Sequence, residues 1–95
     1  IANSIYFRKS MTAAGFDVAG DNHPIIPVMI GDAGVARSFA TKLIEKNIYV
    51  TAFSFPVVPR GQARLRTQIS ATHTRQQIDT CIHAFTEIGK ELNLI

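Results

Sequence analysis

The stretch that decides the fold is GQARLRTQISATHT, residues 61–74. Successive side chains of a strand point to opposite faces, so a strand over residues 63–70 divides into two sets. One set is suited to a core: Ala63, Leu65, Thr67 and Ile69. The other set is polar: Arg64, Arg66, Gln68 and Ser70. From the pattern alone, the polar set is either a row of donors that holds an anion or the solvated side of a half-exposed strand.

The residues around this strand predict the element order α-β-α-β-β-α. Helices are expected over residues 3–14, from Asp32 to about residue 47, and after Thr74, which forms a capping-box pattern with Gln77. The other strands are expected over residues 25–30 and 48–53, and Pro27 indicates an edge strand or a bulge. The predicted fold class is α+β, with a small, mainly antiparallel three-stranded sheet and helices on one face.

The composition indicates one compact domain and excludes several classes of function. The chain has 95 residues, 46% of them apolar, which is room for a single modest core. Lys and Arg exceed Asp and Glu by only 10 to 7, and these charges are scattered, so no nucleic-acid partner is expected. No apolar run is long enough for a transmembrane helix, and no signal peptide is recognisable. The single Cys81 cannot form an internal disulfide, in keeping with a reducing compartment.

The remaining reactive side chains predict no metal site and no nucleophile. His23, His73 and His83 share no ligand spacing with one another or with Cys81. His83 falls beside Asp79 and Glu87 on a polar helix face, as i, i+4 neighbours do. His73 is expected to hydrogen-bond the turn before the last helix. Cys81 lies on an apolar stripe and is expected to be a buried, inert thiol.

A longer run, FPVVPRGQARLRTQISATHT at residues 55–74, resembles the signature of the α-oxoamine synthases. These enzymes use pyridoxal phosphate (PLP), have the fold type I (aspartate aminotransferase-like) structure, and join or split an amino acid and an acyl-CoA. Further similar segments are AGF at 14–16, HPIIPV at 23–28 and AFTEIGKEL at 84–92. The lead-in VVPRG and the continuation RTQIS are most similar to the glycine C-acetyltransferase branch of the family.

The resemblance implies a role for the polar face of the strand. Arg66 matches the arginine that grips the α-carboxylate of the amino-acid substrate, with Gln68 and Ser70 as possible supports behind it. Arg64 is expected to serve structure or a domain interface. The implied reaction converts 2-amino-3-oxobutanoate and CoA to glycine and acetyl-CoA, or the reverse. A homodimer is implied for the full-length enzyme, in the cytoplasm of a bacterium or the mitochondrial matrix of a eukaryote.

Parts of the family's machinery are missing from these residues. PLP chemistry needs a Schiff-base lysine, and the chain's lysines, at positions 9, 42, 46 and 90, lack the family's context for it. No glycine-rich phosphate cradle is present either, so we expect no catalytic and no cofactor-binding residue here. Residues 1–95 are therefore predicted to be the C-terminal domain of a longer PLP enzyme, with 1–15 ending a helix from its cofactor domain. Two alternatives are another α-oxoamine synthase, making 8-amino-7-oxononanoate or 5-aminolevulinate, and a stand-alone α+β module that binds an anion or a protein.

Overall fold

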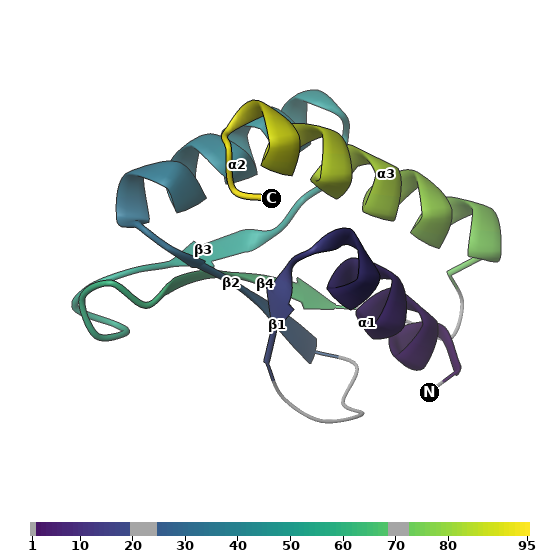
Figure 1. Cartoon of the computed structure of the whole chain (residues 1–95), viewed down its shortest axis with the longest axis horizontal. Coiled ribbons are helices and arrows are strands. Elements are labelled where there is room, and N and C mark those ends of the chain that lie inside the picture. Colours follow the sequence, from purple (N-terminus) through teal and green to yellow (C-terminus); the bar gives the residue numbers. More distant parts are fainter. Residues whose placement is uncertain (1, 20–24, 69–72) are drawn as a thin grey trace.

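The computed structural model describes residues 2–19, 25–68 and 73–95. These residues form an α+β fold whose helices and strands, drawn in Figure 1, are α1 (Ala2–Ala14), β1 (Asp17–Val18), β2 (Ile25–Gly31), α2 (Ala33–Glu45), β3 (Thr51–Phe53), β4 (Ala63–Gln68) and α3 (Arg75–Glu91). The predicted α+β class and the three predicted strands are confirmed.

The sheet is antiparallel with the order β1-β2-β4-β3, so it has one strand more than the sequence predicted. The additional strand, β1, is only two residues long and pairs with Val28 and Met29 of β2. Two residues are too few to show an alternating pattern. Gly15 makes this strand possible, because its φ of +111° turns the chain out of α1.

The interior position of β2 corrects the expectation that Pro27 marks an edge strand or a bulge. β2 lies between β1 and β4, and the bulge falls further along, between Met29 and Gly31. The Pro27 carbonyl accepts a hydrogen bond from the Ala19 N–H at 3.0 Å. The carbonyl and ring nitrogen of Pro27 therefore face away from β4. The lack of an N–H at Pro27 removes no hydrogen bond between β2 and β4.

Two predicted boundaries shift because the chain turns between α2 and β3. The helix ends at Glu45, and Asn47 adopts a positive φ of 63°. The N–H groups of Asn47 and Ile48 then bond to the last carbonyls of α2. Pairing with β4 starts only at Thr51, so β3 is shorter than expected.

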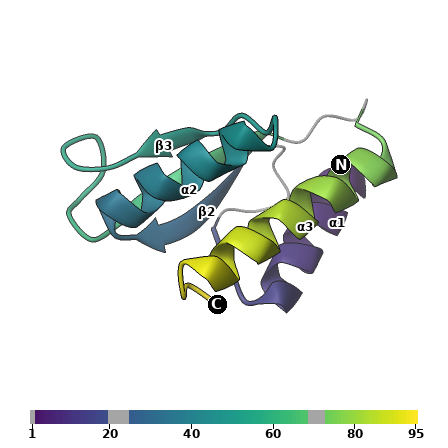
Figure 2. The ribbon, with the colours of Figure 1, turned by 90° about the horizontal axis from the view of Figure 1, so that it is seen from above.

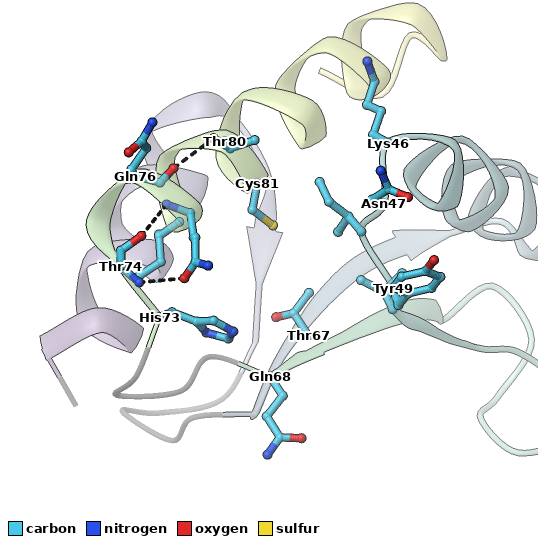
Figure 3. Close-up of a pocket in the computed structure, with 14 residues that line it drawn as sticks. Lys46, Asn47, Tyr49, Thr67, Gln68, His73, Thr74, Gln76, Thr80 and Cys81 are labelled. Atoms are coloured by element: carbon cyan, nitrogen blue, oxygen red, sulfur yellow. Dashed lines mark hydrogen bonds between the residues drawn. The ribbon is translucent and has the colours of Figure 1, made fainter.

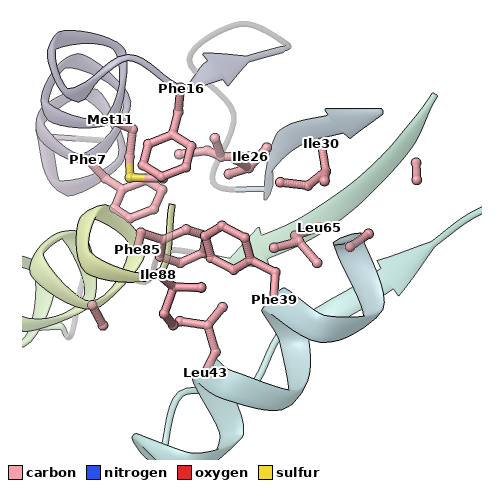
Figure 4. Packing of buried hydrophobic residues seen from close by; sticks show 14 of the residues in the cluster. Phe7, Met11, Phe16, Ile26, Ile30, Phe39, Leu43, Leu65, Phe85 and Ile88 are labelled. Atoms are coloured by element: carbon pink, nitrogen blue, oxygen red, sulfur yellow. The ribbon is translucent and has the colours of Figure 1, made fainter. Parts of the chain in front are cut away.

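The core lies between the sheet and the helices. Figures 1 and 2 show α2 over one face of the sheet, α3 beside α2, and α1 packed under α3 near β1. At its centre Phe85 of α3 meets three other rings, with centroid distances of 5.3–6.2 Å, as Figure 4 shows for Phe7, Phe16 and Phe39. These contacts join α1, α2 and α3 into one hydrophobic cluster over the sheet.

N-terminal caps stand at the expected starts of α2 and α3, and the predicted capping box of Thr74 is confirmed. The Asp32 carboxylate accepts a hydrogen bond from the Val35 N–H at 2.9 Å. At α3, the Thr74 hydroxyl accepts from the Gln77 N–H and the Gln77 side chain accepts from the Thr74 N–H, which completes the capping box. Among the described residues, no helix is both long and apolar enough to cross a membrane.

Polar contacts tie the helices together and correct one expectation. His83 pairs with Glu87 at 3.2 Å, as predicted, whereas Asp79 instead accepts a hydrogen bond from the Tyr6 hydroxyl of α1. The Arg75 guanidinium lies over the Tyr6 ring, 3.6 Å from its centre.

Between α2 and α3, Lys42 Nζ lies 2.6 Å from Glu91 Oε1, and this hydrogen bond raises the pKa of Lys42.

Cys81 is less enclosed than predicted. It is half-buried and packs against the edge of the core instead of lying within it. Even so, loss of solvent around the thiol raises its pKa from 9.0 to about 11. The expectation of an unreactive thiol therefore follows from partial burial alone.

Replacing the cap residue of α3 should destabilise the fold. Thr74→Ala removes the acceptor for the Gln77 N–H, and we expect the free energy of unfolding to fall by about 1 kcal/mol in urea titrations followed by circular dichroism. Thr80→Ala is the matched control, because its hydroxyl bonds only to the Gln76 carbonyl within the same helix. That variant should change stability by less than about 0.5 kcal/mol. Equal losses from the two variants would contradict the role of the cap.

The Cys81 thiol should react slowly with a thiol reagent. With a pKa of about 11 in place of 9.0, the thiolate fraction at pH 8 should be about 100-fold lower than in an unstructured peptide. The reaction rate should rise about tenfold per pH unit up to pH 10, because the thiolate is the reactive form and forms only near its raised pKa. The urea-unfolded chain is the control. A rate that levels off near pH 9 in the folded chain would show that the thiol is not shielded.

Candidate functional site

The candidate site lies on β4, whose two faces differ as the sequence predicted. Ala63, Leu65 and Thr67 are buried beneath the helices, and the Thr67 hydroxyl donates to the Ile26 carbonyl at 2.7 Å. The alternate residues occupy the opposite, outer face of the sheet: Arg64, Arg66 and Gln68. Ile69 and Ser70 lie outside the described residues, so their predicted places on the two faces are not tested.

Arg66 stands at the middle of the outer face. The backbone of β4 is paired on both sides, and the residues opposite Arg66 are Pro27 on β2 and Thr51 on β3. Both neighbours are short and uncharged, which leaves the long arginine side chain clear and exposed. Within the described part of the chain, no carboxylate forms an ion pair with Arg66. Its guanidinium therefore keeps donors for an anion from elsewhere.

One aromatic ring lies beside this guanidinium. Cζ of Arg66 is 5.7 Å from the centre of the Phe53 ring, within the range of a cation–π contact. Phe53 is half-buried on the same outer face, two residues along β3 from Thr51. The sequence analysis did not single out Phe53. The register between β3 and β4 places Phe53 opposite Arg64 and diagonal to Arg66, and a register is not readable from a short strand alone.

Arg64 has a different environment from Arg66. It is half-buried, and its Nε donates to the Gln62 carbonyl at 3.3 Å. This bond folds the guanidinium back toward the loop that leads into β4. The contact agrees with the structural role expected for Arg64.

Gln68 follows Arg66 on the same face. Within the described part of the chain, no hydrogen bond joins the two side chains. Gln68 is exposed at the end of β4 and contributes to the wall of a groove. Its support of Arg66, like that of Ser70, stays a prediction. Ser70 belongs to a segment that the structure does not describe.

The groove opens where residues 46–50, which join α2 to β3, and the end of β4 approach the start of α3, and Figure 3 shows it with His73, Thr67 and Gln68 around the opening. It has a volume of about 640 Å³, and Cys81 and Tyr49 also contribute to its wall. The backbone carbonyl of His73 accepts a hydrogen bond from Asn3 Nδ2 at 2.8 Å, which holds α1 against the start of α3. The turn that the His73 side chain was expected to bond includes undescribed residues, so that expectation is untested.

The described side chains form neither a metal site nor a site for a Schiff-base lysine. In residues 2–19, 25–68 and 73–95, no three His, Cys, Asp or Glu side chains gather to hold a metal ion, and His23 lies outside these ranges. Lys9, Lys46 and Lys90 are exposed, and Lys42 is held by Glu91. Exposed or ion-paired side chains do not fit a Schiff-base lysine, which needs an enclosed site. The described residues therefore offer no lysine suited to attach PLP.

Comparison with known sequences agrees with the signature in residues 55–74. The family model described as aminotransferase class I and II matches residues 1–85. The 2-amino-3-ketobutyrate coenzyme A ligase of Escherichia coli (strain K12) is 58% identical over 94 residues, 99% of this chain and 24% of that protein. An 8-amino-7-oxononanoate synthase of Coprothermobacter proteolyticus is 47% identical over 93 residues, 98% of this chain and 24% of that protein. The chain thus spans about a quarter of the length of these curated relatives.

Comparison with solved structures gives the same family. The serine palmitoyltransferase of S. paucimobilis, solved with a bound PLP–myriocin compound, superposes with a TM-score of 0.90 at 28% identity. The match covers 99% of this chain and 24% of the palmitoyltransferase. The resemblance read from the arginine strand is confirmed, and the chain belongs to the aminotransferase class I and II family, among relatives that are α-oxoamine synthases.

Proposed function

We propose that this chain is the C-terminal domain of a PLP-dependent glycine C-acetyltransferase. The reaction is 2-amino-3-oxobutanoate plus CoA giving glycine and acetyl-CoA, or its reverse. The identity of 58% to a 2-amino-3-ketobutyrate coenzyme A ligase over nearly the whole chain supports this substrate pair. PLP would supply an electron sink for the bond broken at Cα, and the rest of the longer enzyme would hold it.

The observation that carries the proposal is the exposed guanidinium of Arg66 on a strand paired along both edges. A guanidinium offers a planar fork that matches the two oxygens of a carboxylate. Gripping the α-carboxylate at two points fixes the orientation of the amino acid. A fixed orientation of the amino acid would lower the entropic part of the barrier to breaking its bond at Cα.

The surroundings of Arg66 support a strong grip. The residues that share its face on β2 are Ile25, Pro27 and Met29, which are apolar and half-buried even in this chain alone. A face of this composition is suited to being covered by another part of the longer enzyme. Removing water from around the guanidinium would strengthen its attraction to a carboxylate.

Two other functions compete with this proposal. An 8-amino-7-oxononanoate synthase would use the same arginine on a different amino acid, and the lower identity of 47% makes it the second choice. A stand-alone anion-binding or protein-binding module would need no PLP. A panel of amino acids and acyl-CoAs with the full-length enzyme separates the synthases, since glycine with acetyl-CoA should be the best pair.

The partners of the full-length enzyme follow from the proposed reaction. They are glycine or 2-amino-3-oxobutanoate, CoA or acetyl-CoA, and a second copy of the enzyme in a homodimer. We expect the enzyme in the cytoplasm if the source is bacterial and in the mitochondrial matrix if it is eukaryotic.

The 95-residue chain alone should bind no PLP at a defined site, because none of its lysines has a suitable environment. Incubation with PLP followed by borohydride reduction and peptide mapping should give weak labelling scattered over several lysines. The full-length enzyme is the control and should be labelled at one lysine outside this chain. Stoichiometric labelling of one of the four lysines of the chain would contradict the proposed division of roles.

Arg66→Ala in the full-length enzyme should reduce kcat/KM for the amino-acid substrate by roughly 10²–10⁴. Each charge-assisted hydrogen bond contributes about 1.5–3 kcal/mol, and a bidentate pair has two of them. Arg66→Lys keeps the charge without the fork and should recover only part of the loss. The measurements are steady-state kinetics and the absorbance of bound PLP, which should be nearly unchanged.

Arg64→Ala is the matched control for this experiment. It removes the neighbouring arginine of the same strand face, whose Nε is bonded to a backbone carbonyl, and it should affect turnover much less. The KM for the acyl-CoA should also move little in either variant. Equal damage from the two substitutions, or loss of PLP from Arg66→Ala, would mean that the carboxylate is held by another residue.

A further inference from the structure

We propose that Phe53 is a positioning residue for Arg66, and that its ring orients the guanidinium for the substrate carboxylate. The inference rests on the proposed function of Arg66. The ring centre lies 5.7 Å from Cζ of Arg66 on the same outer face of the sheet.

Phe53 does not belong to the hydrophobic core formed by the described residues. Four of the six phenylalanines, Phe7, Phe16, Phe39 and Phe85, belong to the buried cluster. Phe53 is neither in that cluster nor among the partly buried residues packed against it. On the outer face, the described side chain that meets this ring through its charge is Arg66.

The Phe53 ring contacts Arg66 although a different arginine lies directly opposite it. Phe53 lies directly opposite Arg64 in the ladder between β3 and β4, whereas Arg66 is its diagonal neighbour. Nevertheless the ring is in contact with the Arg66 guanidinium, and the Arg64 side chain bonds back to the Gln62 carbonyl. Diagonal neighbours on one face of an antiparallel pair are within reach of aromatic and long side chains. The Phe53 ring is thus in contact with the arginine that we assign to the substrate.

An aromatic ring suits this task better than a polar partner. A carboxylate or carbonyl beside Arg66 would occupy N–H donors of the guanidinium. A ring attracts the cation through its π face and leaves donors available for a carboxylate. It also restricts a side chain with many rotamers before substrate arrives, which reduces the entropic cost of binding.

The test uses the full-length enzyme with three changes at residue 53. Phe53→Leu removes the ring and keeps an apolar side chain, and it should raise the KM for glycine by about 3- to 10-fold. Phe53→Tyr keeps the ring and should stay within about twofold of the original enzyme. Pentafluorophenylalanine at this position keeps the shape of the ring and reverses its charge distribution, so it should raise the KM for glycine as the leucine variant does. It tests the effect of the ring's charge without changing its shape, should the leucine variant fold poorly.

A double-mutant comparison separates positioning from packing. Phe53→Leu should have little further effect on glycine in the Arg66→Ala background and its full effect in the Arg64→Ala background. The KM for acetyl-CoA should be unchanged by the residue 53 variants. An equal effect of Phe53→Leu in both backgrounds, or a pentafluorophenylalanine enzyme with the original KM for glycine, would overturn the proposal. If Arg66→Ala itself left the KM and kcat for glycine unchanged, the assignment of Arg66 would fail, which is a different result from failure at Phe53 alone.

Discussion

Two-sided pairing of β4 is the constraint on which the rest of the structure depends. β2 bonds to one edge of this strand and β3 to the other, so its backbone cannot rotate without breaking two ladders. Because side chains alternate along a strand, this fixed backbone sets the direction of Leu65 into the core and of Arg66 away from it. A slip of one residue would bury the arginine and expose the leucine, which makes the register costly to change.

The helices secure that register from the inner face. Leu65 is fully buried in the same cluster as Phe39 and Phe85, from α2 and α3. Phe85 contacts rings from α1, from α2 and from the segment before β1, so a displacement of α3 would disturb each of them. The dense inner packing therefore holds the position of Arg66 although that side chain does not take part in it.

The parts of the fold that were predictable from sequence are those with a repeating or local signal. The alternation in residues 63–68 and the capping box of Thr74 were read correctly, because each rests on residues close together in the chain. β1 was missed because two residues carry no period. The prediction of an edge strand from Pro27 was wrong because the Pro27 backbone faces the side of β2 that pairs with the short strand β1. The order of strands in a sheet is not contained in any local sequence pattern. Phe53 was overlooked for the same reason, since its contact with Arg66 depends on the register between two strands.

Contacts between arginines and aromatic rings recur in this chain, and their settings differ. The Arg75 guanidinium lies over Tyr6, whose hydroxyl is bonded to Asp79, so this contact is part of the junction of α1 and α3. Arg60 lies 3.9 Å from the centre of the Phe55 ring within the loop between β3 and β4, where both side chains are exposed. Arg66 and Phe53 differ from both pairs, because they stand on neighbouring strands of the sheet and project from a face that the helices leave uncovered. An oriented cation on a rigid backbone, with donors still available, is the arrangement that recognition of a carboxylate requires.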